Sequence, residues 1–164
     1  QVGACGDRFP AGRGRLRLCE RGQQAAGVNP YSCLNLVGAA QVGKSSLTGM
    51  RVLHRLRGSI PVWPFDPVPE TGPLIVEIYT ALASRAAIPA RRGTKIRDAQ
   101  TLDLALSALD SQQHAPLERY TDHATDAILT AAWLRRAASQ AALWAPALLT
   151  SEIAQTEGWT FGVV

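Results

Sequence analysis

The chain has 164 residues, of which 46% are hydrophobic and 18% charged, and its formal net charge is +4. These values favour one domain, or one domain and a small appendage, with a buried core, and argue against a wholly disordered chain. No stretch of about 18 apolar residues and no apolar signal-peptide segment occurs, which argues against a membrane-spanning helix and a secretory leader.

The first part of the chain alternates predicted helices with short extended segments. Residues 1–16 are rich in Arg and Gly and predict an irregular segment. A helix is expected over 15–26, so the two expected segments overlap at residues 15 and 16. A strand is expected over 31–37 and a loop of small residues over 38–43. A second helix is expected to begin at Ser45 or Ser46, either of which could cap it, and to end near Arg57.

The second part of the chain contains the strongest predicted strand. Two prolines within 60–66 predict an extended segment there. Residues 74–79 are apolar and mostly β-branched apart from Glu77, as expected of a strand buried on both faces. Helices are expected over 80–87, 98–109 and 121–138, and a short strand over 159–163. This order is typical of an α/β fold.

The positive charge is concentrated in the first 60 residues. They carry nine Lys or Arg against two acidic residues, a net charge of +7, whereas the remainder carries eight against eleven, a net charge of −3. Five of the nine are Arg8, Arg13, Arg15, Arg17 and Arg21. Arginine suits phosphate, so this half predicts nucleic acid as a partner, and the alternative is a solvated basic surface.

The cysteines predict a reduced protein. Cys5, Cys19 and Cys33 are odd in number and lack paired spacing, which argues against a disulfide framework. No histidine follows them at zinc-finger spacing. We therefore expect incidental thiols in a cytoplasmic protein. Residue 1 is Gln and Met50 is the only methionine, which predicts that the chain is a fragment.

Residues 38–45 match the nucleotide-binding P-loop pattern G-x-x-x-x-G-K-[ST] through Gly38, Gly43, Lys44 and Ser45. In such a loop backbone amides cradle phosphate, the lysine meets the β- and γ-phosphates and the serine holds Mg²⁺. However, few strand candidates follow, and a P-loop sheet needs several crossover units. The alternative is a turn of small residues that begins a helix.

Three carboxylates predict a metal site. Glu77 is the one charge in its apolar strand, so it needs a partner, a proton or a metal ion. Asp122 and Asp126 are four residues apart and share one face of the expected helix. Oxygen ligands of this kind suit Mg²⁺ or Mn²⁺. His123 is more typical of a helix cap or a surface residue than of a ligand.

Five motifs occur in an order that resembles one family. They are residues 43–50 (GKSSLTGM), 61–66 (PVWPFD), 75–79 (IVEIY), 122–127 (DHATDA) and 157–162 (EGWTFG). Together they resemble the domain-of-unknown-function 429 family, whose members are predicted to be RNase H-like nucleases. The resemblance runs from about Arg17 to the C-terminus.

The resemblance implies a fold and a reaction. The expected fold is an α/β, RNase H-like mixed sheet with flanking helices over 17–164, without the N-terminal strands and the aspartate that the first of them carries. Glu77, Asp122 and Asp126 would be catalytic metal ligands, with Asp126 favoured by its similarity to a resolvase motif. The implied function is metal-dependent phosphodiester hydrolysis. The alternatives are P-loop nucleotide binding and a non-catalytic nucleic-acid-binding module.

Overall fold

The structure, a computed structural model, describes residues 16–36, 42–88 and 95–164. The chain divides into two compact units. Unit 1 comprises Gln1–Glu77 and Ala147–Val164, and unit 2 comprises Ile78–Pro146. Unit 2 is thus a continuous stretch of chain inserted between the two pieces of unit 1.

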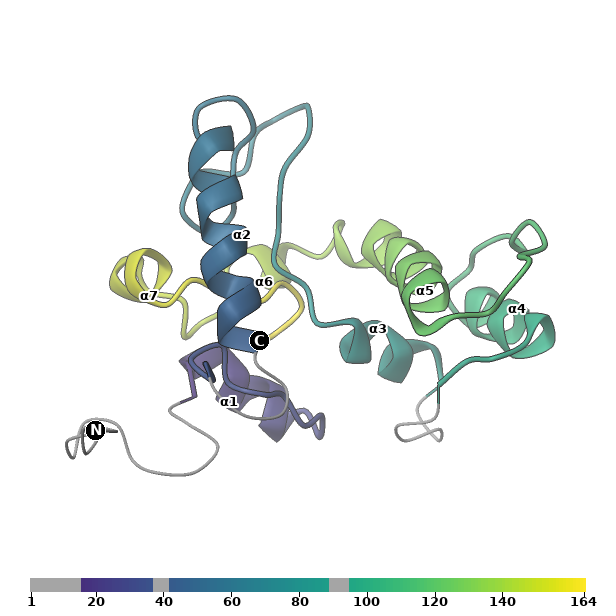
Figure 1. Ribbon diagram of the computed structural model, residues 1–164. Coiled ribbons are helices and arrows are strands. Elements are labelled where there is room, and N and C mark those ends of the chain that lie inside the picture. The colour runs from purple at the N-terminus through teal and green to yellow at the C-terminus, as the bar shows by residue number, and fades with distance from the viewer. Residues whose placement is uncertain (1–15, 37–41, 89–94) are drawn as a thin grey trace, which may run out of the picture. The chain divides into compact units, whose positions relative to one another are not determined.

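Unit 1 contains three of the described helices, α1 (Leu18–Ala25), α2 (Val42–Leu56) and α7 (Ser151–Thr156). Figure 1 shows α2 (blue) beginning beside α1 and extending away from it. Gly22 of α1 lies against the C-terminal segment, since a Cβ atom there would be 2.5 Å from Val163 Cγ1. The buried apolar side chains of this unit are Cys19, Val62, Trp63, Trp159, Phe161 and Val163.

Three extended segments of unit 1 lie side by side without forming a ladder. Val62 and Ile75 form an isolated parallel bridge, in which the amide of Trp63 donates to the carbonyl of Ile75 over 2.9 Å. Glu77 and Thr160 form a second one. Residues 74–77 therefore pair once with a segment on each side. A strand ladder needs successive pairs with the same neighbour, which these segments do not provide.

The predicted α/β, RNase H-like mixed sheet is therefore wrong for the described residues, which form helices and only these two bridges. The strand expected over 31–37 is a turn and irregular chain as far as residue 36, and the extended segment expected over 60–66 closes into a turn. The strands expected over 74–79 and 159–163 are reduced to single bridge residues. Trp159, Phe161 and Val163 do enter the core of unit 1, whereas Leu74, Ile75 and Val76 are only half-buried, so the expected burial of 74–79 on both faces is wrong as well.

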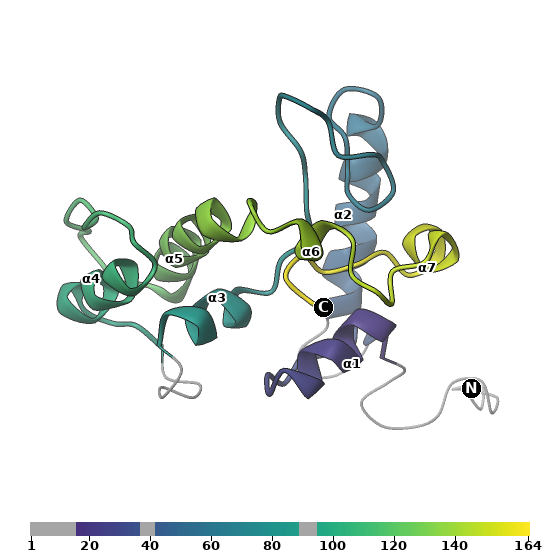
Figure 2. The same cartoon turned by 180° about the vertical axis from the view of Figure 1, so that it is seen from behind.

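In its described part, unit 2 has helices as its regular elements, joined by irregular segments of which 109–121 is the longest. It contains α3 (Thr80–Ala87), α4 (Ala99–Ala108), α5 (Asp122–Ala137) and the short α6 (Ala141–Trp144). Figures 1 and 2 show α5 beside both α3 and α4, which it contacts. The buried apolar residues contributed by these helices are Ala83, Ala87, Leu102, Ala105, Leu106, Leu129, Ala132, Trp133 and Ala137. The predictions over 80–87, 98–109 and 121–138 are confirmed to within one residue at each end.

Polar caps explain where two of these helices begin. The Asp98 carboxylate accepts a hydrogen bond from the amide of Thr101 over 2.7 Å at the start of α4. The Thr121 hydroxyl accepts one from the amide of Ala124 over 3.3 Å at the start of α5. Both satisfy amides that the first helical turn leaves free. Within the described ranges, no helix has the length and apolar character needed to cross a bilayer.

Candidate functional site

Helix α2 is exposed along nearly its whole length, and Gly43 is its one buried residue. Ser46, Gly49, Leu53 and Leu56 are half-buried and share one face. Lys44, Thr48, Arg51 and Arg55, spaced by four, three and four residues, share the opposite, exposed face. We call Lys44, Arg51 and Arg55 the cationic face of α2. The inward packing of the small and apolar face thus leaves three cations pointing to solvent.

Among the described residues, no acidic side chain pairs with this face. The sequence holds no Asp or Glu between Glu20 and Asp66. Within the described part of the chain, no ion pair involves Lys44, Arg51 or Arg55. An unpaired row of cations on an exposed helix produces a local positive potential that attracts anions.

The start of α2 has a structural explanation for its glycine. A Cβ atom on Gly43 would lie 2.7 Å from the carbonyl oxygen of Cys33 and 2.8 Å from that of Asn35. The Gly43 amide donates a hydrogen bond to the Asn35 carbonyl over 2.9 Å. That amide is occupied by the protein itself, whereas a phosphate cradle needs it free. Gly38 lies outside the described residues, so the P-loop remains a prediction that the Gly43 amide does not favour.

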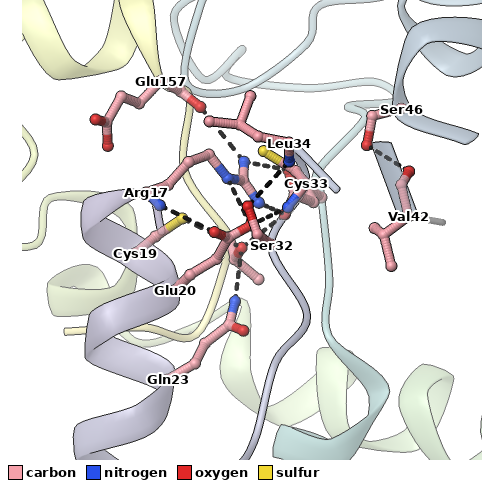
Figure 3. Close-up of polar contacts among 12 residues, drawn as sticks. Arg17, Cys19, Glu20, Gln23, Ser32, Cys33, Leu34, Val42, Ser46 and Glu157 are labelled. Atoms are coloured by element: carbon pink, nitrogen blue, oxygen red, sulfur yellow. Dashed lines mark hydrogen bonds and ion pairs between the residues drawn. The ribbon is translucent and has the colours of Figure 1, made fainter. Parts of the chain in front are cut away.

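Ser45 and Ser46 were expected to cap α2, and this is wrong. The helix includes Val42, so both serines lie inside it and not before its first residue. The Ser46 hydroxyl instead donates back to the Val42 carbonyl over 3.1 Å (Figure 3). Lys44 and Ser45 are exposed on the helix surface.

Two hollows lie along α2. One, of about 430 Å³, is lined by Leu47, Met50, Arg51, His54 and Arg55. The other, of about 520 Å³, is lined by Met50, Leu53, His54, Arg57, Val62, Phe65, Asp66 and Gln155. They share Met50 and His54, and the first includes two members of the cationic face. We call the second hollow the α2 groove.

Glu77 belongs to a polar cluster around Arg17. The Arg17 guanidinium donates to both oxygens of Glu77, over 2.8 and 2.5 Å, and to Glu20 Oε1 over 3.1 Å. The Thr160 hydroxyl also donates to Glu77, over 2.7 Å. Figure 3 shows the Arg17 side chain between α1 and the carbonyl of Glu157, which it meets at 3.3 Å. Through these contacts Arg17, which immediately precedes α1, connects this helix to Glu77 and to the segment 157–160.

This cluster sets the charge state of Glu77. Partial burial alone would raise the pKa of its carboxyl, but the hydrogen bonds and charge of Arg17, with the Thr160 hydroxyl, hold that pKa below its usual range. Burial also raises the pKa of the Cys33 thiol. The charge of nearby Arg17 opposes this effect only in part, so the pKa stays raised, at about 11. Glu77 is thus an ionised partner of Arg17, and the Cys33 thiol ionises less readily than an ordinary cysteine.

Asp122 and Asp126 share a face of α5, as expected, and basic side chains neutralise them. Lys95 Nζ lies 3.3 Å from Asp126 Oδ2 and 3.8 Å from Asp122 Oδ2. Arg97 Nη1 is 2.5 Å from Asp122 Oδ1, a close ion pair without hydrogen-bond geometry. The Thr80 hydroxyl donates to Asp126 over 3.3 Å. Lys95 therefore already stands between the two carboxylates.

The three predicted metal ligands thus have separate surroundings, with Glu77 in unit 1 and the aspartates in unit 2. Among the described residues, no group of three or more Asp, Glu, His or Cys side chains is arranged to hold a metal ion. His123, at the first turn of α5, is exposed. Metal binding by these carboxylates stays a prediction.

Sequence reasoning did not find a histidine cluster in unit 2. His114 Nδ1 lies 2.7 Å from Asp103 Oδ1, and its Nε2 lies 2.8 Å from the Tyr120 hydroxyl. The two rings meet edge to face at 5.5 Å. The three residues lie at irregular spacings along the chain, so no sequence pattern could have signalled them.

Comparison of the chain with protein-family models, curated proteins and solved structures finds no match. The surface of α2 and the contacts of the carboxylates are therefore the observations on which a functional proposal can rest.

Proposed function

We propose that unit 1 is a nucleic-acid-binding module and that the cationic face of α2 contacts the phosphate backbone. The observation that carries the proposal is the exposed row of Lys44, Arg51 and Arg55 on a helix with no acidic residue. At a rise of about 1.5 Å per residue, this row is about 16 Å long, enough to follow several successive phosphates. Arginine forks match phosphate oxygens, and the lysine adds a point charge.

The contrast with unit 2 supports this choice of surface. Lys95 and Arg97 are also exposed cations, but both already have carboxylate partners. Lys95 pairs with Asp122 and Asp126, and Arg97 pairs with Asp122. A cation that already has a carboxylate partner gains less from a phosphate, because binding must break the existing pair. When phosphates bind the unpaired cations of α2, counterions leave the nucleic acid and no existing ion pair has to be broken.

Binding is proposed here without hydrolysis. Metal-dependent nuclease activity through Glu77, Asp122 and Asp126 rested on the resemblance and on a mixed sheet, and it stays a prediction without a fold to support it. A metal ion at Glu77 would compete with Arg17 for the carboxylate, and one at the two aspartates would compete with Lys95.

The test is a salt titration of oligonucleotide binding. Fluorescence anisotropy of a labelled DNA duplex is measured with the wild type and with a Lys44→Ala, Arg51→Ala, Arg55→Ala triple variant. The matched control is Lys95→Ala, Arg97→Ala, Arg119→Ala, which removes the same residue types from unit 2. Both triples lower the net charge equally, so any difference between them reports position.

We expect the α2 triple to weaken binding strongly and to lower the slope of log K against log salt by about 2 to 3, close to 0.9 for each lost phosphate contact. The control triple should keep most of the wild-type slope. Equal losses in the two triples would mean that net charge alone governs binding, and the α2 interface would be rejected.

A further inference from the structure

The α2 groove combines an aromatic ring with cationic and amide side chains next to the cationic face. Phe65 and Met50 are 54% and 55% exposed, so both offer apolar surface at the groove. Arg57, His54 and Gln155 also line the groove. Its volume of about 520 Å³ lies within the range of small-molecule sites.

Phe65 is held in this position by the turn that contains it. The Asp66 amide donates to the Val62 carbonyl over 2.9 Å, and the Asp66 carboxylate accepts from the Val62 amide over 2.9 Å. Trp63, in the same turn, points inward and meets Phe161 edge to face at 5.9 Å. The turn thus buries one aromatic ring and presents the next one to the groove.

The ring of Phe65 is supported on one side. A Cβ atom at Gly158 would lie 3.2 Å from Phe65 Cζ, so this glycine leaves room for the ring edge. Gly158 also has φ +67°, a conformation that few other residues adopt. The edge of the ring thus lies against Gly158 while the side chain stays 54% exposed at the wall of the groove, a position that suits stacking with another flat group.

The charge around the groove favours an anionic occupant. Asp66 is the one carboxylate among its lining residues, and it already accepts the Val62 amide. Arg57 adds a cation, and the neighbouring hollow adds Arg51 and Arg55. Because the two hollows share Met50 and His54, a chain with phosphates on the cationic face can place a side group in the groove.

We propose that the α2 groove takes an unpaired nucleobase stacked on Phe65, which makes single-stranded nucleic acid the substrate class. This inference rests on the proposed function, since the phosphates of the same strand would lie on the cationic face. Bases in a duplex are stacked on one another and cannot offer a face to the ring, whereas unpaired bases stack readily on aromatic side chains. Stacking of this kind tolerates every base.

The test compares three labelled probes of about 12 nucleotides, within the site sizes of single-strand binders. They are an oligothymidylate, an abasic strand with the same number of phosphates, and a duplex of the same length. Each is titrated with the wild type, with Phe65→Leu, which keeps apolar bulk, and with Tyr31→Leu as the control. Tyr31 is likewise a half-exposed aromatic residue of unit 1. Thermal melts of both variants check folding.

The wild type should bind the oligothymidylate about 5- to 150-fold more tightly than the abasic strand, the range for stacking of one base. Phe65→Leu should lose this preference, bind the abasic strand as the wild type does, and keep its salt slope because no charge is removed. Tyr31→Leu should behave as the wild type. Because the comparison of probes on the wild type needs no variant, it holds even if Phe65→Leu folds poorly.

Equal wild-type affinity for the abasic and thymidylate strands, a wild-type preference for the duplex, or an unchanged preference in a folded Phe65→Leu variant would overturn the base-binding groove. If the α2 triple variant still weakened all probes, the phosphate interface would stand while the groove failed. Absence of binding to every probe would overturn both.

Discussion

Replacing Arg17 by methionine should destabilise the protein more than any other single change in the polar cluster of unit 1. The Arg17 side chain is 12% exposed and that of Glu20 is 3% exposed, so their ion pair is buried. Methionine keeps the length of the side chain but leaves the Glu20 carboxylate without a cation. Removing one member of a buried pair typically costs about 3–5 kcal/mol.

The structure places Arg17→Met at the lower end of that range. Glu20 keeps two backbone donors, the amides of Arg17 and Cys33, each 2.9 Å from its oxygens. A loss of about 3 kcal/mol in the free energy of unfolding follows. Glu77→Gln should cost no more than about 1 kcal/mol, because Glu77 is 47% exposed and Arg17 retains Glu20.

Acid should narrow the difference between the wild type and Arg17→Met. The Glu77 pKa is held below its unfolded value of about 4.3, so its stabilisation is present above that value and is lost as the pH falls through the lower, folded one. The variant lacks the Arg17 part of this contribution at every pH and keeps only that of Thr160. The stability gap should therefore shrink as the pH is lowered from about 5 towards 2.

Urea unfolding followed by tryptophan emission measures these effects, since Trp63 and Trp159 are buried in unit 1. Arg136→Met is the control, because its ion pair with Asp110 is exposed and should contribute less than about 1 kcal/mol. A loss for Arg17→Met no greater than that for Arg136→Met, or a gap that widens in acid, would refute the reasoning.

Two further predictions concern helix starts and interiors. Gly43→Ala should destabilise unit 1 by about 1–3 kcal/mol because its Cβ would meet backbone oxygens, whereas Gly49→Ala, with nothing within 4 Å, should stabilise α2 by about 0.5–1 kcal/mol. In thermal melts, Gly43→Ala should therefore lower the melting temperature and Gly49→Ala should raise it. Equal shifts in the two variants would contradict the contacts described for Gly43. Thr121→Ala should cost about 0.5–2 kcal/mol through loss of the α5 cap, and Thr121→Ser should restore most of it, as urea unfolding would reveal.

The helices were largely predictable from the sequence because their signals are local. Apolar residues at helical spacing and polar residues at the start identify α4 and α5, whose bounds agree with the predicted ones to within one residue. The start of α2 was predicted three or four residues late. Gly43, the second residue of the helix, packs against the carbonyls of Cys33 and Asn35, and no local pattern reports such a contact. The short helices α6 and α7 were not predicted, because a helix of four to six residues is too short to show a helical periodicity in its sequence.

The strands failed because an apolar run does not specify its partners. Residues 74–79 have the composition of a buried strand, yet they pair only once on each side. The same limit applies to Glu77, for which the sequence indicated a need for a partner. The partner is Arg17, 60 residues earlier, and no spacing rule could identify it. The shared face of Asp122 and Asp126 was predictable, but their neutralisation by Lys95 was not.

The cationic face of α2 lay within the predicted basic half of the chain, but only the fold singles out its three members. Arg17 belongs to the same basic half and is consumed by Glu20 and Glu77. Net charge per segment therefore predicted a class of partner, while packing decides which cations remain available for it.

The division of the chain also fixes an order of events during synthesis. Unit 2 is continuous, so it can fold as soon as residue 146 has left the ribosome. Unit 1 cannot be completed then, because Gln23 and Leu18 are bonded to Thr160 and Glu157, which are made about 140 residues later. Until the last segment emerges, the basic helix α2 is displayed on a half-built unit. We therefore expect a nascent chain to contain Lys44, Arg51 and Arg55 before the groove beside them, which needs Gln155 and Gly158, can form.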